Sequence, residues 1–74
     1  MPDIIKHLPK GTKIKVTWPF ASRTLYVSTA INYFDNQGDD WYIEAYEQLE
    51  PEPKGYYYIK QRQEQVTIEI LESA

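Results

Sequence analysis

Two aromatic-rich segments separated by a break that contains proline and glycine constrain this chain more than any other feature. The first segment is WYIEAYEQL at residues 41–49, the break is EPEPKG at residues 50–55, and YYYI follows at residues 56–59. This order is typical of a β-hairpin with a loop of medium length. We therefore expect one strand over residues 41–49 and a second over residues 56–62.

The two faces of this hairpin can be separated by residue number, because side chains alternate between the faces of a β-strand. One face is apolar and predicts the core; it carries Trp41, Ile43, Ala45, Tyr57 and Ile59. The other face carries four tyrosines, Tyr42, Tyr46, Tyr56 and Tyr58, together with Glu44 and Lys60. Three favourable cross-strand pairs are expected on this second face: Tyr46 with Tyr58, Glu44 with Lys60, and Tyr42 with Arg62.

Three other stretches predict strands. Residues 13–18 alternate between polar and apolar side chains after a turn at Lys10-Gly11, and residues 66–71 alternate in the same way. Residues 24–34 form a long run rich in β-branched and aromatic side chains. Because this run is longer than an ordinary strand, we expect a bend at Ser28 and Ala30, with the two ends serving different sheets.

Five predicted strands, with turn signals at intervals of about eight to twelve residues, indicate an all-β fold. A small five-stranded SH3-like barrel fits this spacing best, and an OB-like barrel is the alternative. The length of 74 residues indicates one domain over residues 1–74. Residues 1–10 form either a short turn or the start of a strand, and residues 72–74 are expected to fray.

The alternation also predicts which side chains of the other strands enter the core. They are Ile14, Val16, Trp18, Leu25, Val27, Ile31, Tyr33, Val66, Ile68 and Ile70. Phe20 lies in the loop that begins at Pro19. We expect its ring to fold back on the core as a plug, because an exposed aromatic ring is costly without a partner; an exposed contact is the alternative.

Few residues suit catalysis or metal binding. The chain has no cysteine and one histidine, His7, and each of its three glycines stands alone in a turn, so no phosphate-binding loop is present. We expect no enzymatic activity and no cofactor. Asp35, Asp39 and Asp40 lie in DNQGDD, which reads as a turn and lacks the distal glutamate of an EF-hand. We expect no metal site there.

Charge is distributed unevenly along the chain, whose net charge is -3. Residues 1–34 contain five basic residues and one acidic residue, whereas residues 35–74 contain three basic and ten acidic residues. This asymmetry indicates either neutralisation between neighbouring strands or an interaction surface. No stretch approaches the roughly 20 apolar residues of a membrane span, no secretory signal is visible, and the lack of cysteine suits a reducing compartment. We expect a cytoplasmic protein without a membrane partner.

The tyrosine-bearing face of the hairpin is the strongest candidate site. Tyrosine combines a large apolar ring with a polar tip and is enriched at protein interfaces. We therefore expect a protein-interaction module that binds a partner protein, or a second copy of itself, through Tyr42, Tyr46, Tyr56, Tyr58 and Lys60. One alternative is that the tyrosines only stabilise the sheet. The other is a nucleic-acid site, in which the rings stack on bases while Lys54, Lys60 and Arg62 contact phosphates.

Overall fold

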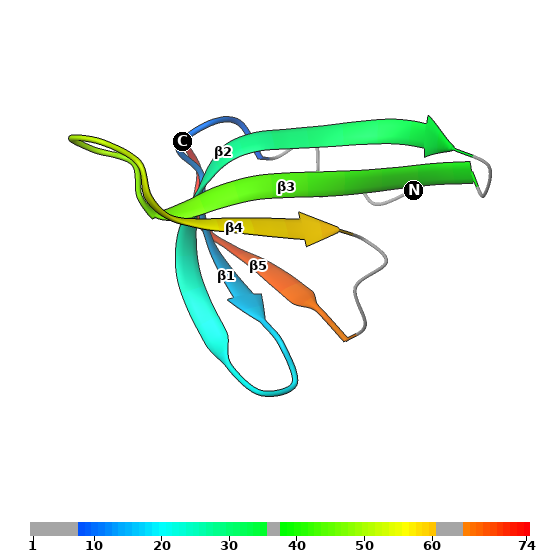
Figure 1. Cartoon of the computed structure of the whole chain (residues 1–74), viewed down its shortest axis with the longest axis horizontal. Helices are drawn as coiled ribbons and strands as arrows, with labels where there is room; N and C mark the ends of the chain where they lie inside the picture. Colours follow the sequence, from blue (N-terminus) through cyan, green and yellow to red (C-terminus); the bar gives the residue numbers. More distant parts are fainter. Residues whose placement is uncertain (1–7, 36–37, 61–64) are drawn as a thin grey trace.

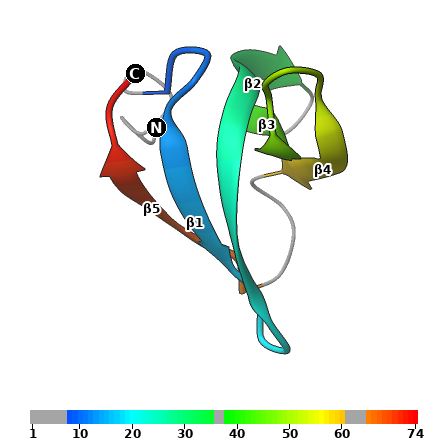
Figure 2. The same ribbon diagram turned by 90° about the vertical axis from the view of Figure 1, so that its left-hand side faces the viewer.

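The computed structural model describes residues 8–35, 38–60 and 65–74, without the side chains of residues 33–39. Its regular structure is one antiparallel sheet with the strand order β4-β3-β2-β1-β5. The strands are β1 (Lys13–Thr17), β2 (Ser22–Asp35), β3 (Gly38–Gln48), β4 (Lys54–Lys60) and β5 (Thr67–Glu72). The predicted all-β fold with five strands is confirmed. The sheet is strongly curved but not closed, because β4 and β5 form its two edges (Figures 1 and 2).

No helix in the described ranges has the length and apolar character that crossing a membrane would require.

The long strand β2 connects the two halves of the sheet. Residues 22–26 pair with β1, and residues 26–35 pair with β3. The register with β3 shifts between Val27 and Thr29, which places a β-bulge at Ser28. A bulge bends its strand and increases the local twist, and β2 curves accordingly in Figures 1 and 2. The predicted bend is therefore present, although the two ends of β2 belong to one continuous sheet and not to two.

The bulge also reverses which residues of β2 point toward the core. Beyond it, Ala30 pairs with the buried Ile43, whereas Ile31 pairs with Tyr42 on the opposite face. Ile31 is 40% exposed, so the expectation that it enters the core is wrong. One extra residue in a strand shifts the two-residue alternation by one position, and every later side chain changes face.

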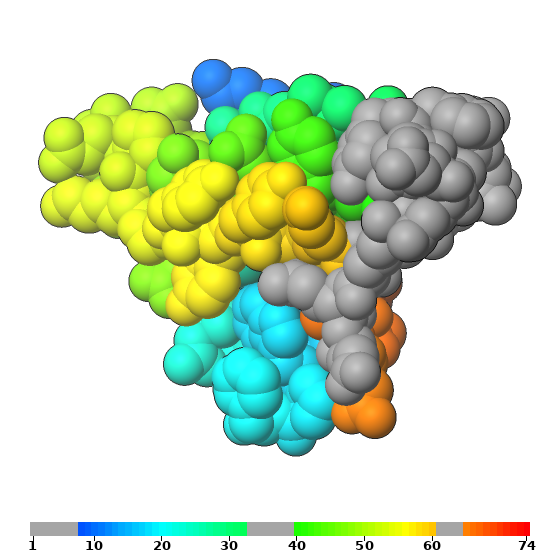
Figure 3. All heavy atoms as spheres, turned by 45° about the vertical axis from the view of Figure 1, so that its right-hand side comes forward, coloured from blue at the N-terminus to red at the C-terminus, as the bar shows by residue number. Residues whose placement is uncertain are grey.

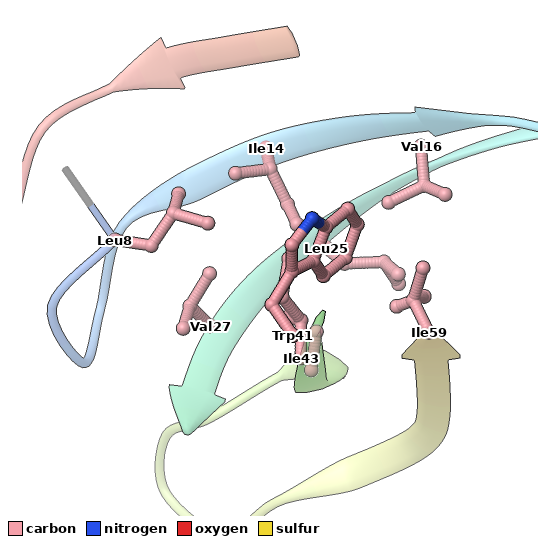
Figure 4. Close-up of a cluster of buried hydrophobic side chains, with 9 residues drawn as sticks. Leu8, Ile14, Val16, Leu25, Val27, Trp41, Ile43 and Ile59 are labelled. Carbon is pink, nitrogen blue, oxygen red and sulfur yellow. The ribbon is translucent and has the colours of Figure 1, made fainter. Parts of the chain in front are cut away.

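The core lies inside the curve of the sheet (Figure 4). It contains Leu8, Ile14, Val16, Leu25, Val27, Trp41, Ile43, Ala45 and Ile59, and six more apolar side chains pack against it: Trp18, Ala30, Tyr57, Val66, Ile68 and Ile70. Most of the predicted inward residues are confirmed by this set. Leu8 joins the core from the segment that the sequence left undefined, where Thr12 Oγ1 donates a hydrogen bond of 2.8 Å to the carbonyl oxygen of Pro9. Residues 1–7 and the side chain of Tyr33 lie outside the described part of the chain.

Phe20 does not fold back on the core. The backbone N–H of Trp18 donates to the carbonyl oxygen of Ala21 at 2.7 Å, so only Pro19 and Phe20 form the tip between β1 and β2. At this tip the ring of Phe20 stacks on the side chain of Trp18 and does not enter the core. The ring of Phe20 is 84% exposed, and the expected plug is wrong.

The hairpin of β3 and β4 has a different register from the one expected. The observed pairs are Tyr46 with Tyr56, Glu44 with Tyr58, and Tyr42 with Lys60. The expected pairing is wrong by two residues because β4 begins at Lys54, which shortens the loop to residues 49–53. Gly55 permits this early start: its φ is +73°, and a Cβ atom there would lie 2.7 Å from the Cγ of Glu47. Residues 61–64, including Arg62, lie outside the described part of the chain.

The stretch expected to be a turn at residues 35–40 belongs mostly to strands. β2 extends to Asp35 and β3 starts at Gly38, so only residues 36–37, which are not described, connect them. Asp40 is 1% exposed, and its Oδ1 accepts a hydrogen bond of 2.8 Å from the backbone N–H of Trp41. This carboxylate is therefore part of the folded interior of the hairpin and not of an open turn.

The bulge predicts that Ile43 and Ile31 contribute unequally to the free energy of unfolding, because it leaves one in the core and turns the other outward. Ile43 is fully buried and Ile31 is 40% exposed. We expect Ile43→Ala to lower the free energy of unfolding by about 2–5 kcal/mol, because it leaves a cavity in the core. Ile31→Ala removes the same atoms and is expected to cost less than about 1 kcal/mol. Urea denaturation of both variants measures the difference, and equal losses would contradict the bulge.

Candidate functional site

The outer face of β2, β3 and β4 gathers tyrosines from all three strands. We call this surface the tyrosine face; it consists of Tyr26, Ile31, Tyr42, Glu44, Tyr46, Tyr56, Tyr58 and Lys60. Cross-strand pairing arranges it in rows, and one row runs from Tyr26 through Tyr46 to Tyr56. In the other rows Tyr42 lies between Ile31 and Lys60, and Glu44 lies beside Tyr58. The face forms because alternate residues of paired strands point to the same side.

The rings of this face pack against one another in two pairs. The ring centroids of Tyr42 and Tyr58 are 5.3 Å apart at an interplanar angle of 45°, and those of Tyr46 and Tyr56 are 5.4 Å apart at 57°. Tilted pairs at such distances stabilise by about 0.5–1.5 kcal/mol beyond the area they bury. Tyr56 is 52% exposed and Tyr58 is 41% exposed, so the pairs still present ring surface to solvent. The surface is thus already ordered before any partner arrives.

A carboxylate and an ammonium group accompany the rings. The hydroxyl of Tyr56 donates a hydrogen bond of 2.6 Å to Oε2 of Glu44. This hydrogen bond, together with the negative charge of Glu44, raises the pKa of Tyr56 from 10.0 to about 12, because both favour the protonated phenol. At the other end of the face, Nζ of Lys60 lies 5.8 Å from the ring centroid of Tyr58, within the range of a cation–π contact.

The structure places all five predicted site residues on one face. Tyr42, Tyr46, Tyr56, Tyr58 and Lys60 come together there, although through a different register from the one expected. Lys54 lies at the start of β4, where its Nζ is 3.7 Å from Oε1 of Glu52. Arg62 lies outside the part of the chain that the structure describes. Ile31 was missed because only the bulge turns it toward this face.

A second aromatic cluster on the other side of β4 was not predicted. We call it the Trp18 groove; it holds about 350 Å³ and is lined by Trp18, Phe20, Ala21, Arg23, Tyr57 and Tyr58. The rings of Trp18 and Phe20 stack with centroids 6.2 Å apart, and the ring of Tyr57 lies 5.8 Å from Trp18. The signal in the sequence is Pro19-Phe20 directly after a strand, from which we expected a plug on the core and not a groove. Tyr58 borders both this groove and the tyrosine face.

A third feature is a hollow at the start of the β3–β4 loop. It holds about 510 Å³ and is lined by Gly11, Tyr26, Glu47, Gln48, Leu49 and Glu50. We call it the Tyr26 pocket. The ring of Tyr26 and the side chain of Leu49 are its apolar parts, while Glu47 and Glu50 bring two carboxylates. The Oε2 atom of Glu47 also accepts a hydrogen bond of 3.3 Å from the hydroxyl of Tyr57.

The basic first half of the chain meets the acidic second half between two neighbouring strands. Lys13 pairs with Glu72 and Lys15 pairs with Glu69 across β1 and β5. The Nζ atom of Lys13 lies 3.4 Å from Oε1 of Glu72. These pairs favour the interpretation that the charge asymmetry is partly neutralised on folding. They also reduce the positive charge beside Tyr26, which pairs with Lys13 on β1.

Among the residues that the structure describes, no group of three histidine or carboxylate side chains could hold a metal ion. His7 and the side chains of Asp35 and Asp39 are not part of that description.

A search of known protein families, of curated proteins and of solved structures gives no match to this chain.

Because its hydroxyl donates a hydrogen bond to Glu44, we expect Tyr56 to lose its proton at a higher pH than an ordinary tyrosine. Glu44→Gln removes the negative charge, so we expect the pKa of Tyr56 to fall from about 12 toward 10.0. Because the folded pKa lies above the unfolded value, the stability that this hydrogen bond contributes is complete below about pH 10 and is lost as the pH rises through 12. Absorbance titration of the phenols checks the shift. Tyr56→Phe is the control, and it should remove the late transition altogether.

Proposed function

We propose that this chain is a small, non-enzymatic interaction module that binds a protein partner through the tyrosine face. The observation that carries the proposal is the exposed pair of rings on edge strand β4, where Tyr56 is 52% and Tyr58 is 41% exposed. Their neighbours on β3, Tyr42 and Tyr46, support them from one side. A contiguous exposed aromatic surface of this kind marks interaction sites more often than ordinary protein surface does.

The order within the face also supports the proposal. Each exposed ring is already packed against a second ring, so little side-chain freedom remains to be lost when a partner covers it. Glu44 and Lys60 supply an acceptor and a donor beside the rings, which can fix the orientation of a partner. Ile31 adds apolar surface next to Tyr42. Binding energy would then centre on the rings, as in interfaces where a few aromatic residues dominate.

We also propose that the sheet is an opened SH3-like barrel. The support is its five strands and the long bent β2, which pairs with β1 at one end and β3 at the other. The proposal concerns architecture alone, because one fold serves many functions.

Nucleic-acid binding through the same rings is the competing hypothesis. It would use base stacking on the tyrosines and phosphate contacts from lysines such as Lys60. The carboxylate of Glu44, hydrogen-bonded to Tyr56 within the same face, disfavours a phosphate backbone there. We expect no saturable binding of single- or double-stranded oligonucleotides at low salt, measured by fluorescence anisotropy. Saturable binding that weakens steeply with salt would favour the competing hypothesis instead.

The test of the tyrosine face is a double substitution on the paired rings. A partner is first captured from cell extract with the wild-type chain, identified and purified. We then expect Tyr46→Ala with Tyr56→Ala to weaken its binding by about tenfold or more in calorimetry, because aromatic residues at an interface centre commonly carry most of the binding energy.

Two control variants show whether a loss of affinity is specific to the rings of Tyr46 and Tyr56. Thr24→Ala changes an exposed side chain on β2 outside the tyrosine face and should leave the affinity unchanged. Tyr46→Phe with Tyr56→Phe keeps the rings and should lose less affinity than the alanine pair. An unchanged affinity in the alanine pair, with the circular dichroism spectrum of a folded sheet, would remove the tyrosine face as the binding site.

A further inference from the structure

The tip of the β1–β2 hairpin carries an aromatic ring that the described part of the chain leaves uncovered. Phe20 is 84% exposed, the highest value among the large apolar side chains that are exposed in the described residues. It stacks on Trp18 at a centroid distance of 6.2 Å, so its position is held by a second ring. Arg23 lies beside it on the wall of the Trp18 groove. The tip therefore combines a fixed apolar knob with a guanidinium group.

The Tyr26 pocket has the complementary properties. Its volume of about 510 Å³ exceeds what one phenyl ring needs, and Tyr26 and Leu49 offer apolar surface inside it. Two carboxylates, those of Glu47 and Glu50, border the same hollow. A phenylalanine accompanied by an arginine is the kind of group that such a pocket accepts, because the ring meets apolar walls and the guanidinium meets carboxylates.

The knob and the pocket lie at separate corners of the molecule. Figure 3 shows the cyan tip of the β1–β2 hairpin protruding at the bottom, while the yellow-green β3–β4 loop protrudes at the left. Figure 1 shows the same separation from another angle. Phe20 is therefore not placed to fill the pocket of its own chain, but a second copy can present its tip there.

We propose that this protein self-associates head to tail, with Phe20 of one copy inserted into the Tyr26 pocket of the next. Arg23 of the first copy then meets Glu50 or Glu47 of the second, which gives the contact its charge complementarity. The contact joins two different surfaces, so each pair of copies retains one free tip and one free pocket. Association can continue into a ring or an open chain. The contact shares Tyr26 with the tyrosine face but uses none of its other tyrosines.

The wild-type chain provides the first test. We expect sedimentation velocity to show masses above the 8.8 kDa of one chain as the concentration is raised toward about 1 mM, the range of weak association. Amide and indole NMR signals of Trp18, Phe20, Leu49 and Glu50 should shift together on dilution. A sedimenting species that remains monomeric, with no shift at these positions, would overturn the proposal without any variant.

Two variants then test the asymmetry of the contact. Phe20→Ser removes the knob but leaves the pocket, and Leu49→Arg obstructs the pocket with a charge that repels Arg23 while it leaves the knob. Each variant alone should self-associate at least about tenfold more weakly than the wild type. An equimolar mixture should form a dimer that grows no further, because only one productive contact remains between the two variants.

The mixture separates this contact from a symmetric one that joins two tips or two pockets. If a two-fold contact joined identical surfaces, mixing would restore nothing, and that result would overturn the head-to-tail arrangement. A wild type that stops at a dimer would also overturn it, because a reciprocal two-fold contact closes after two copies. Glu69→Gln, a change at an exposed position on β5 outside both surfaces, is the matched control and should associate like the wild type. Association that survives unchanged in both Phe20→Ser and Leu49→Arg would also overturn the proposal. Tyr46→Ala with Tyr56→Ala should leave the association intact, because neither residue lines the pocket. Circular dichroism confirms that each variant is folded.

Discussion

The β-bulge at Ser28 is the local constraint on which the rest of the sheet depends. It lets β2 turn from its pairing with β1 to its pairing with β3 without leaving the sheet. Past the bulge, the small side chain of Ala30 meets Ile43 in the core, while Ile31 is turned out beside Tyr42. A straight strand with unbroken alternation would place Ile31 inside and Ala30 outside. The bulge therefore determines both that Ala30 joins the core and that Ile31 joins the tyrosine face.

Edge strand β4 gives the molecule two different aromatic surfaces. Tyr57 points inward and packs near Trp18, whereas Tyr56 and Tyr58 point outward and pack on Tyr46 and Tyr42. An exposed edge strand can pair with other chains, and lysines are a common protection against such pairing. Lys54 and Lys60 occupy the two ends of β4. The strand is thus protected along its edge while its side chains remain available on both faces.

Opposite charges lie side by side on the neighbouring strands β1 and β5, whereas the β1–β2 tip and the Tyr26 pocket each carry charge of one sign. β1 and β5 bring Lys13 and Lys15 beside Glu72 and Glu69. The hairpin tip with Arg23 and the pocket with Glu47 and Glu50 keep opposite signs on separate surfaces. Exposed charges contribute little to the stability of a single chain, because water and salt screen them. Their arrangement bears more on what the surface attracts than on how the sheet folds.

Alternation of apolar and polar residues was sufficient to predict five strands, an all-β fold and most of the core, because the side-chain period of a strand is a local property. The same alternation predicted that Tyr42, Tyr46, Tyr56, Tyr58 and Lys60 share one face. Three features depended on the folded sheet: the bulge that exposes Ile31, the register that pairs Tyr46 with Tyr56, and the exposure of Phe20. Register and bulges are decided by how two strands fit together and by the loop that joins them. That fit is a balance of contacts between residues far apart in sequence, so it becomes visible only in the tertiary structure.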